Sequence, residues 1–293
     1  MKFWVALSFS DPTHLVALAR KAEEVGLHGV FLADHLVYPE QLASHYPYAE
    51  AEAGPPFPAD TPFPEPWCTS SAMAAVTRTL KLSVAVHILP LHDPIEVAKS
   101  TSTAAVLSGG RLALGAGVGW MKEEFDIQRI DFASRGRRTD EMIEVLRKLW
   151  TGRPVAHQGE FFRFPAVRMS PAAPGPIPIW IGGASRPALR RAARLGDGWI
   201  GHGHTYDEAG ALLDELARLR AEAGRAHLPF ENIIPLAEPL ERDRLAKLAA
   251  RGMTAGLIVP PVLGLGVPKP TLAQEQAYLE RMGEQVVRPL ASV

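Results

Sequence analysis

The stretch RLALGAGVGWMKEEFDIQRIDFASRGRRTDEMIEVLRKLW, residues 111–150, gives the clearest indication of the fold. A buried strand at Leu112–Leu114 leads into the glycine-alternating turn Gly115–Gly119, and we expect a helix to open at Met121–Phe125. Glycine lets a backbone come close to a ligand. Ligands bind at the carboxyl ends of parallel strands in barrel and doubly wound folds. The pattern therefore predicts a binding site at this turn.

Short strand-like segments alternate with helix-like segments on both sides of this stretch. Eight such pairs in a chain of 293 residues are typical of a (β/α)8 barrel, the TIM barrel. We therefore predict the α/β class and one barrel domain over residues 1–293. The expected strands are residues 3–8, 28–33, 81–89, 111–115, 177–181, 197–201, 232–236 and 255–259. The expected helices start near residues 15, 68, 95, 137, 187, 207, 242 and 272.

Two insertions interrupt the alternation. Residues 38–66 hold prolines at positions 39, 47, 55, 56, 58, 62, 64 and 66, which rule out a regular helix. This segment follows the second strand, so we expect it to lie over the barrel mouth as a substrate-shaping lid. Residues 152–178 precede the fifth strand and are expected to form a short hairpin that covers the other end of the barrel.

Composition excludes several classes of protein. The net charge is −1 with acids and bases interspersed, unlike the basic surface of a nucleic-acid binder. The single cysteine, Cys68, excludes an internal disulfide framework and a cysteine-based zinc site. A reduced, cytoplasmic setting is the simplest interpretation. The apolar start of the chain is short and is followed by Asp11-Pro12, so we expect a strand there and neither a signal peptide nor a membrane span.

Five segments resemble, in the same order, the luciferase-like monooxygenase superfamily, in its branch that uses the deazaflavin coenzyme F420. They are Ala22–Leu36, Leu91–Lys99, Leu107–Phe125, Arg137–Trp150 and Pro176–Trp199. The resemblance covers most of the chain up to about residue 203, while the last third is similar only in its alternation of strand-like and helix-like segments. It implies a barrel fold, a flavin-type cofactor and oxidoreductase activity.

Asp34 and His35 close the second strand on the face where ligands bind. Histidine titrates near neutral pH and suits proton transfer. In similar deazaflavin enzymes an Asp-His pair at this place lies over the reactive ring. The resemblance thus implies that His35 is the catalytic acid or base and that Asp34 contacts the cofactor or orients the site.

The resemblance also implies a bulge in the third strand that supports the cofactor ring through a non-proline cis peptide. We place this bulge at Val86–His87. For His87 the reading as a buried, hydrogen-bonded histidine stays open. Gly117, Val118 and Gly119 are expected to pass beside the cofactor. Related sugar-phosphate dehydrogenases carry a glutamate where this chain has Trp120, so their substrate is not transferred, and Trp120 is a candidate wall of the substrate pocket.

A phosphate cradle is predicted after the fifth and sixth strands. Gly182-Gly183-Ala184-Ser185 opens a helix, where free N–H groups and the helix dipole favour an anion. The hydroxyl of Ser185 adds a donor, and Gly201-His202 closes the same site from the next strand. Coenzyme F420 and FMN both carry a phosphate, so the cradle does not separate them.

The leading functional hypothesis is hydride transfer between F420 and a small organic substrate under the lid. An FMN monooxygenase that uses oxygen, with a flavin reductase as partner, is the alternative. A metal-dependent hydrolase is a more distant one, suggested by His35, His87, His92, His202 and His204; our prediction is that no metal is bound. A non-catalytic cofactor carrier is a third. A homodimer is expected from the resemblance, and neither nucleic acid nor membrane is expected as a partner.

Overall fold

The computed structural model describes residues 1–48 and 57–293. Within them, nine parallel strands form one sheet in the order β3-β2-β1-β11-β10-β9-β8-β5-β4. A parallel bridge joins Leu82 of β3, one edge strand, to Leu112, which precedes β5 beside the other edge, so the sheet closes into a barrel. The strands are β1 Lys2–Ala6, β2 Gly29–Leu32, β3 Lys81–Val84, β4 His87–Ile88, β5 Leu114–Gly117, β8 Ile179–Gly182, β9 Gly198–Ile200, β10 Glu231–Ile234 and β11 Ala255–Ile258.

The third barrel strand is broken in two. It runs as β3 to Val84, leaves the ladder, and resumes as β4 at His87, so β3 and β4 share one of eight positions in the barrel. A non-proline cis peptide joins Ala85 to Val86, one bond before the Val86–His87 pair at which we placed it. The expected continuous strand over residues 81–89 was therefore wrong at its centre.

The fourth barrel strand lies later than predicted. It covers Leu114–Gly117 instead of residues 111–115, so the first glycines of the expected turn are strand residues. The reason is steric: a Cβ at Gly115 would lie 1.8 Å from the carbonyl oxygen of Val84. Glycine at this position allows the fourth strand to pass close to the third.

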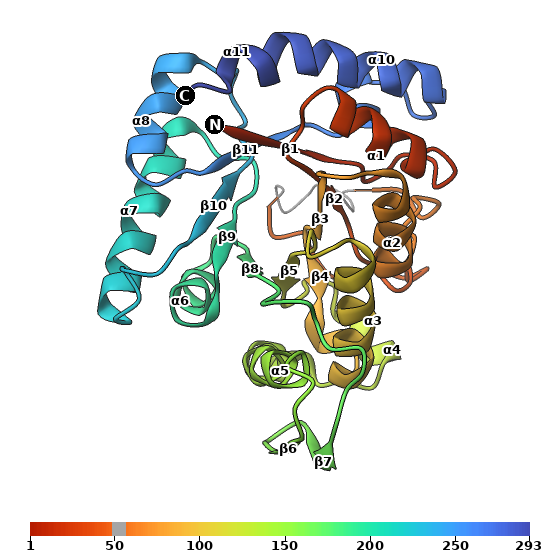
Figure 1. Ribbon diagram of the computed structural model, residues 1–293, viewed down its shortest axis with the longest axis vertical. Helices are drawn as coiled ribbons and strands as arrows, with labels where there is room; N and C mark the ends of the chain where they lie inside the picture. The colour runs from red at the N-terminus through yellow and green to blue at the C-terminus, as the bar shows by residue number, and fades with distance from the viewer. Residues whose placement is uncertain (49–56) are drawn as a thin grey trace.

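Eight helices of the described chain surround the barrel (Figure 1). They are α1 Leu15–Glu24, α2 Pro66–Val76, α3 Pro94–Leu107, α5 Arg135–Leu149, α6 Arg186–Leu195, α7 Tyr206–Glu222, α8 Arg242–Ala250 and α10 Leu272–Met282. Shorter helical segments are η1 Leu89–Leu91, α4 Lys122–Ile127, η2 Phe132–Ser134, α9 Pro261–Leu265, η3 Gly283–Val287 and α11 Arg288–Leu290. The predicted α/β barrel is thus confirmed. In the part of the chain described, no helix combines the length and apolarity needed to cross a membrane.

Three aromatic rings pack together inside the barrel. Trp4 stacks on Phe31 with ring centroids 4.5 Å apart and meets Trp180 edge-on at 5.3 Å. A Cβ at Gly29 would lie 2.3 Å from the Trp4 ring, and one at Gly198 would lie 2.4 Å from Trp180. These two glycines therefore make room for the large rings, which fill the barrel as a packed core and not as a pore.

The two insertions differ in how much of them can be described. Residues 152–178 form the predicted hairpin, with β6 Val155–Gln158 antiparallel to β7 Arg163–Val167. The hairpin packs along the outside of α5 instead of across the end of the barrel (Figure 1). Residues 49–56 of the expected lid lie outside the described residues.

Candidate active site

His35 follows β2 and is held by a buried glutamate of α4. Its Nδ1 lies 2.9 Å from Oε2 of Glu124, whose side chain is only 1% exposed. The other oxygen of Glu124 accepts a hydrogen bond from the Leu36 N–H at 2.8 Å. An ionised carboxylate only accepts hydrogen bonds. Of the two ring nitrogens of His35, only Nδ1 has a hydrogen-bond partner among the described residues, which leaves Nε2 as the ring nitrogen available to a ligand.

Aromatic side chains surround the ring of His35. Its centroid lies 5.0 Å from that of Phe57, 4.9 Å from Phe63 and 6.1 Å from Trp120. Phe57 and Phe63 belong to the predicted lid, and Trp120 follows β5. The expected wall residue Trp120 thus stands beside the candidate catalytic histidine. Such an environment excludes water and strengthens a hydrogen bond to His35.

Asp34 points to the bulge between β3 and β4. Its Oδ2 accepts a hydrogen bond from the Ile88 N–H at 2.9 Å and lies 3.2 Å from Nε2 of His92 and 2.7 Å from Nδ1 of His87. Burial opposes ionisation of this carboxyl, but the two imidazoles outweigh it and hold the pKa of Asp34 well below its ordinary value. Asp34 is therefore an anion whose carboxylate holds the residues that follow the bulge.

Asp34, His87 and His92 also bring three metal-ligand atoms within 4.8 Å of one another. The rings of His87 and His92 are stacked, with centroids 4.1 Å apart and planes 22° from parallel. Their lone pairs lie in two nearly parallel planes, whereas zinc needs nitrogens that converge on a point about 2.0–2.1 Å from each. The geometry favours a hydrogen-bonded cluster over a metal centre.

The predicted phosphate cradle lies where β8 enters α6. Ser185 caps α6 by accepting a hydrogen bond from the Ala188 N–H at 3.4 Å. Burial raises the pKa of Tyr48, a residue of the lid segment, and the nearby backbone N–H of Ala184 opposes this rise. A Cβ at Gly183 would lie 3.1 Å from the same hydroxyl. A lid oxygen therefore lies beside the loop at which the sequence predicts a phosphate.

His202 joins this cradle from the end of β9. Its ring centroid lies 3.8 Å from that of Tyr48, and its Nδ1 lies 3.0 Å from Nε2 of His204. Burial, together with the neighbouring His204, lowers the pKa of His202 to about 4. At neutral pH His202 is uncharged, so it would contact a phosphate as a hydrogen-bonding group and not as a cation.

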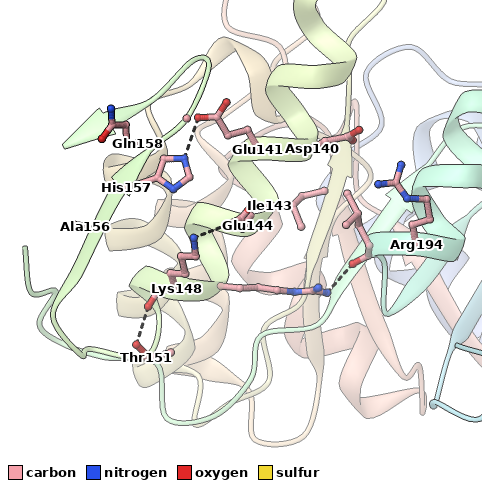
Figure 2. Close-up of a pocket in the computed structure, with 13 residues that line it drawn as sticks. Asp140, Glu141, Ile143, Glu144, Lys148, Thr151, Ala156, His157, Gln158 and Arg194 are labelled. Carbon is pink, nitrogen blue, oxygen red and sulfur yellow. Dashed lines mark hydrogen bonds and ion pairs between the residues drawn. The ribbon is translucent and has the colours of Figure 1, made fainter. Parts of the chain in front are cut away.

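A cleft of about 780 Å³ lies between α5, β6 and α6, and Figure 2 shows the residues that line it. Lys148 and Glu144 form an ion pair in its wall, and His157 bonds to Glu141. None of the residues that line this cleft is one of the sequence-predicted site residues. The site residues predicted from the sequence lie instead at the barrel mouth, and that location of the active site stays a prediction.

A family model described as luciferase-like monooxygenase matches residues 4–237. The chain belongs to the luciferase-like monooxygenase family. An uncharacterized protein of Mycobacterium tuberculosis is 37% identical to this luciferase-like chain over 267 residues, which is 90% of this chain and 92% of the relative.

Solved structures agree with the fold of this luciferase-like protein. A monooxygenase from Streptomyces bottropensis and a coenzyme F420-dependent tetrahydromethanopterin reductase from Methanopyrus kandleri both match with a TM-score of 0.76. They are 18% and 15% identical, and the match covers 99% of each chain. The FMN-bound oxygenating constituent of a Pseudomonas putida diketocamphane monooxygenase matches with a TM-score of 0.64 and 17% identity, over 80% of this chain and 66% of that one. At such identities the likeness shows the fold alone.

Val86 explains two of the glycines that we expected to face a cofactor in this luciferase-like chain. A Cβ at Gly117 would lie 2.2 Å from one methyl of Val86, and a Cβ at Gly182 would lie 2.4 Å from the other. Both glycines thus make room for the bulge residue. Approach of the cofactor to Gly117, Val118 and Gly119 stays a prediction.

The structure brings the predicted residues into two groups. One lies around the bulge and contains Asp34, His35, Val86 and His87; the other is the cradle, which contains Gly183, Ala184, Ser185, Gly201 and His202. Sequence reasoning missed Glu124, whose partner His35 is 89 positions away. The one available signal was a pair of acids opening a helix directly after the glycine turn.

Proposed function

We propose that this luciferase-like protein is an F420-dependent oxidoreductase that transfers hydride to or from a small organic substrate. The observation that carries the proposal is the fixed position of His35 beside Trp120 at the barrel mouth. From Trp120, contacts continue through Tyr46 and Tyr48 to the Ala184 N–H of the cradle. A cofactor with a ring near His35 and a phosphate at the cradle would run alongside these side chains.

When bound, the deazaflavin supplies the hydride donor or acceptor. The chain supplies the proton transfer: in oxidation the unprotonated Nε2 of His35 takes a proton from the substrate, and in reduction the same nitrogen, protonated in the imidazolium form, gives one to a substrate oxygen or carbon. Phe57, Phe63 and Trp120 keep water from this position. The N–H groups that follow β8 bind the phosphate.

Parallel titration of the protein with F420 and FMN, followed by tryptophan fluorescence, tests the cofactor. We expect tight binding of F420 and weak binding of FMN, and Trp120 reports on the site because it lies beside His35. Tight binding of FMN alone would instead identify an oxygen-using monooxygenase with a flavin reductase partner. Binding of neither would contradict both cofactor proposals and return attention to the metal-dependent hydrolase, which metal analysis of the pure protein would then test.

Tyr48 is expected to compete with the cofactor phosphate for the Ala184 N–H. Tyr48→Phe removes the hydroxyl and leaves the ring on His202. A neutral hydrogen bond contributes about 0.5–1.5 kcal/mol net, so the variant should bind F420 a few-fold more tightly. The half-buried Tyr38, which forms no hydrogen bond with Ala184 and no ring contact with His202 in the described part of the chain, provides the control Tyr38→Phe, which should bind as the parent does. Weaker binding by Tyr48→Phe would show that the hydroxyl contacts the cofactor instead of competing with it.

Three expectations from the sequence stay predictions. They are a homodimer, a cytoplasmic location and a small-molecule substrate whose identity requires a screen of alcohols and unsaturated compounds.

A further inference from the structure

We propose that Glu124 is a positioning residue that determines which nitrogen of His35 carries the proton. The kinetic part of this inference rests on the proposed function, in which Nε2 of His35 exchanges a proton with the substrate. The structural part does not, because it concerns two side chains that are in contact in the protein alone.

The two oxygens of Glu124 have different partners. Oε2 lies 2.9 Å from Nδ1 of His35, while Oε1 accepts from the N–H groups of Leu36 at 2.8 Å and Val37 at 3.5 Å. Burying a carboxylate is costly unless it is hydrogen-bonded. Within the described residues no lysine or arginine forms an ion pair with Glu124. The partners of this carboxylate are His35 and the backbone N–H groups that follow it.

Glu123, the preceding residue, binds a different part of the segment after β2. Its Oε1 accepts from the N–H groups of Ala43 at 2.8 Å and Ser44 at 3.0 Å. The two acids of α4 therefore hold the segment after β2 at two points, and only Glu124 contacts the histidine. Because they are adjacent and chemically identical, Glu123→Gln is a matched control for Glu124→Gln.

Glutamine at position 124 is expected to reverse the protonation of His35. The backbone N–H groups of Leu36 and Val37 require an oxygen, so the amide oxygen stays with them and the NH₂ group turns to Nδ1. An NH₂ group donates, so Nδ1 must become the acceptor and the proton moves to Nε2. The side-chain shape is almost unchanged, but the nitrogen that faces the substrate has changed its role.

Nitrogen NMR of the histidine-labelled protein shows directly which ring nitrogen of His35 carries the proton. The His35 signal is assigned by its loss in His35→Ala. We expect Nδ1–H in the parent and in Glu123→Gln, and Nε2–H in Glu124→Gln. An Nε2–H form in the parent, or a Glu124→Gln form that keeps Nδ1–H, would overturn the inference. The parent measurement needs no variant, so the test survives if Glu124→Gln does not fold.

The kinetic readout separates positioning from a structural role. Glu124→Gln should lower kcat about tenfold with F420 affinity and KM unchanged, because only proton transfer is affected. Glu123→Gln should raise KM a few-fold at constant kcat, because it loosens the lid segment. Equal effects of the two variants on KM would contradict a role in positioning. Failure of F420 binding in the parent would refute the proposed function and leave the NMR result unaffected.

Discussion

His35→Ala is expected to lower turnover by about 10²- to 10⁴-fold, which is the range that a positioned general acid or base contributes. Cofactor affinity should change little, because the predicted cradle lies on β8, α6 and β9 and shares no hydrogen bond with His35 among the described residues. The measurement is kcat for F420 oxidation or reduction with the substrate found by screening, beside the dissociation constant for F420.

His45 supplies the control for this experiment. It lies in the same segment but is exposed to solvent, so His45→Ala should retain parental kcat. Circular dichroism of His35→Ala checks that the aromatic packing around the lost ring has not collapsed. Parental turnover by a folded His35→Ala protein would remove His35 from the mechanism, and a loss of F420 binding would place it among the binding residues instead.

The barrel was predictable because its signals are local. Each apolar segment and its following helix carry their own periodicity, and eight of them fit one architecture. The break at Ala85–Val86 was misplaced by one bond and Leu114–Gly117 by a few residues, because both depend on contacts between strands. Gly115 is required by Val84 and Gly117 by Val86, and neither requirement can be read from the glycine itself.

Only those residues of the candidate site that directly follow a strand could be predicted from the sequence. Asp34 and His35 were identified by their place after β2, but their partners come from β4, the segment after η1, and α4. Glu124 looks like an ordinary first-turn acid until the fold brings it to His35. Asp34 was expected to contact the cofactor or orient the site; in the structure its carboxylate bonds to the bulge, and a direct contact with the cofactor stays a prediction.

Asp34→Ala is expected to reduce the free energy of unfolding by about 2–4 kcal/mol, because each buried donor left without its acceptor costs about 1–3 kcal/mol. The substitution leaves the Ile88 N–H and the His92 imidazole without their acceptor and removes the carboxylate that lies 2.7 Å from Nδ1 of His87. Urea unfolding at pH 7 measures the loss. Asp93→Ala is the matched control, because Asp93 is an exposed cap of α3 whose removal costs about 1 kcal/mol.

The pH dependence of the loss of unfolding free energy in Asp34→Ala shows whether the charge of Asp34 causes it. The folded state lowers the pKa of Asp34, so its charge stabilises the fold fully above the ordinary carboxyl pKa of about 4. That contribution decreases as the pH falls below this value toward the folded-state pKa. In this range the unfolded chain binds a proton at Asp34 while the folded chain does not, and this favours unfolding. The gap in the free energy of unfolding between parent and Asp34→Ala should therefore narrow as the pH falls below about 4. A gap that stays constant down to pH 3 would mean that Asp34 stabilises the bulge through its shape and hydrogen bonds alone, without its charge.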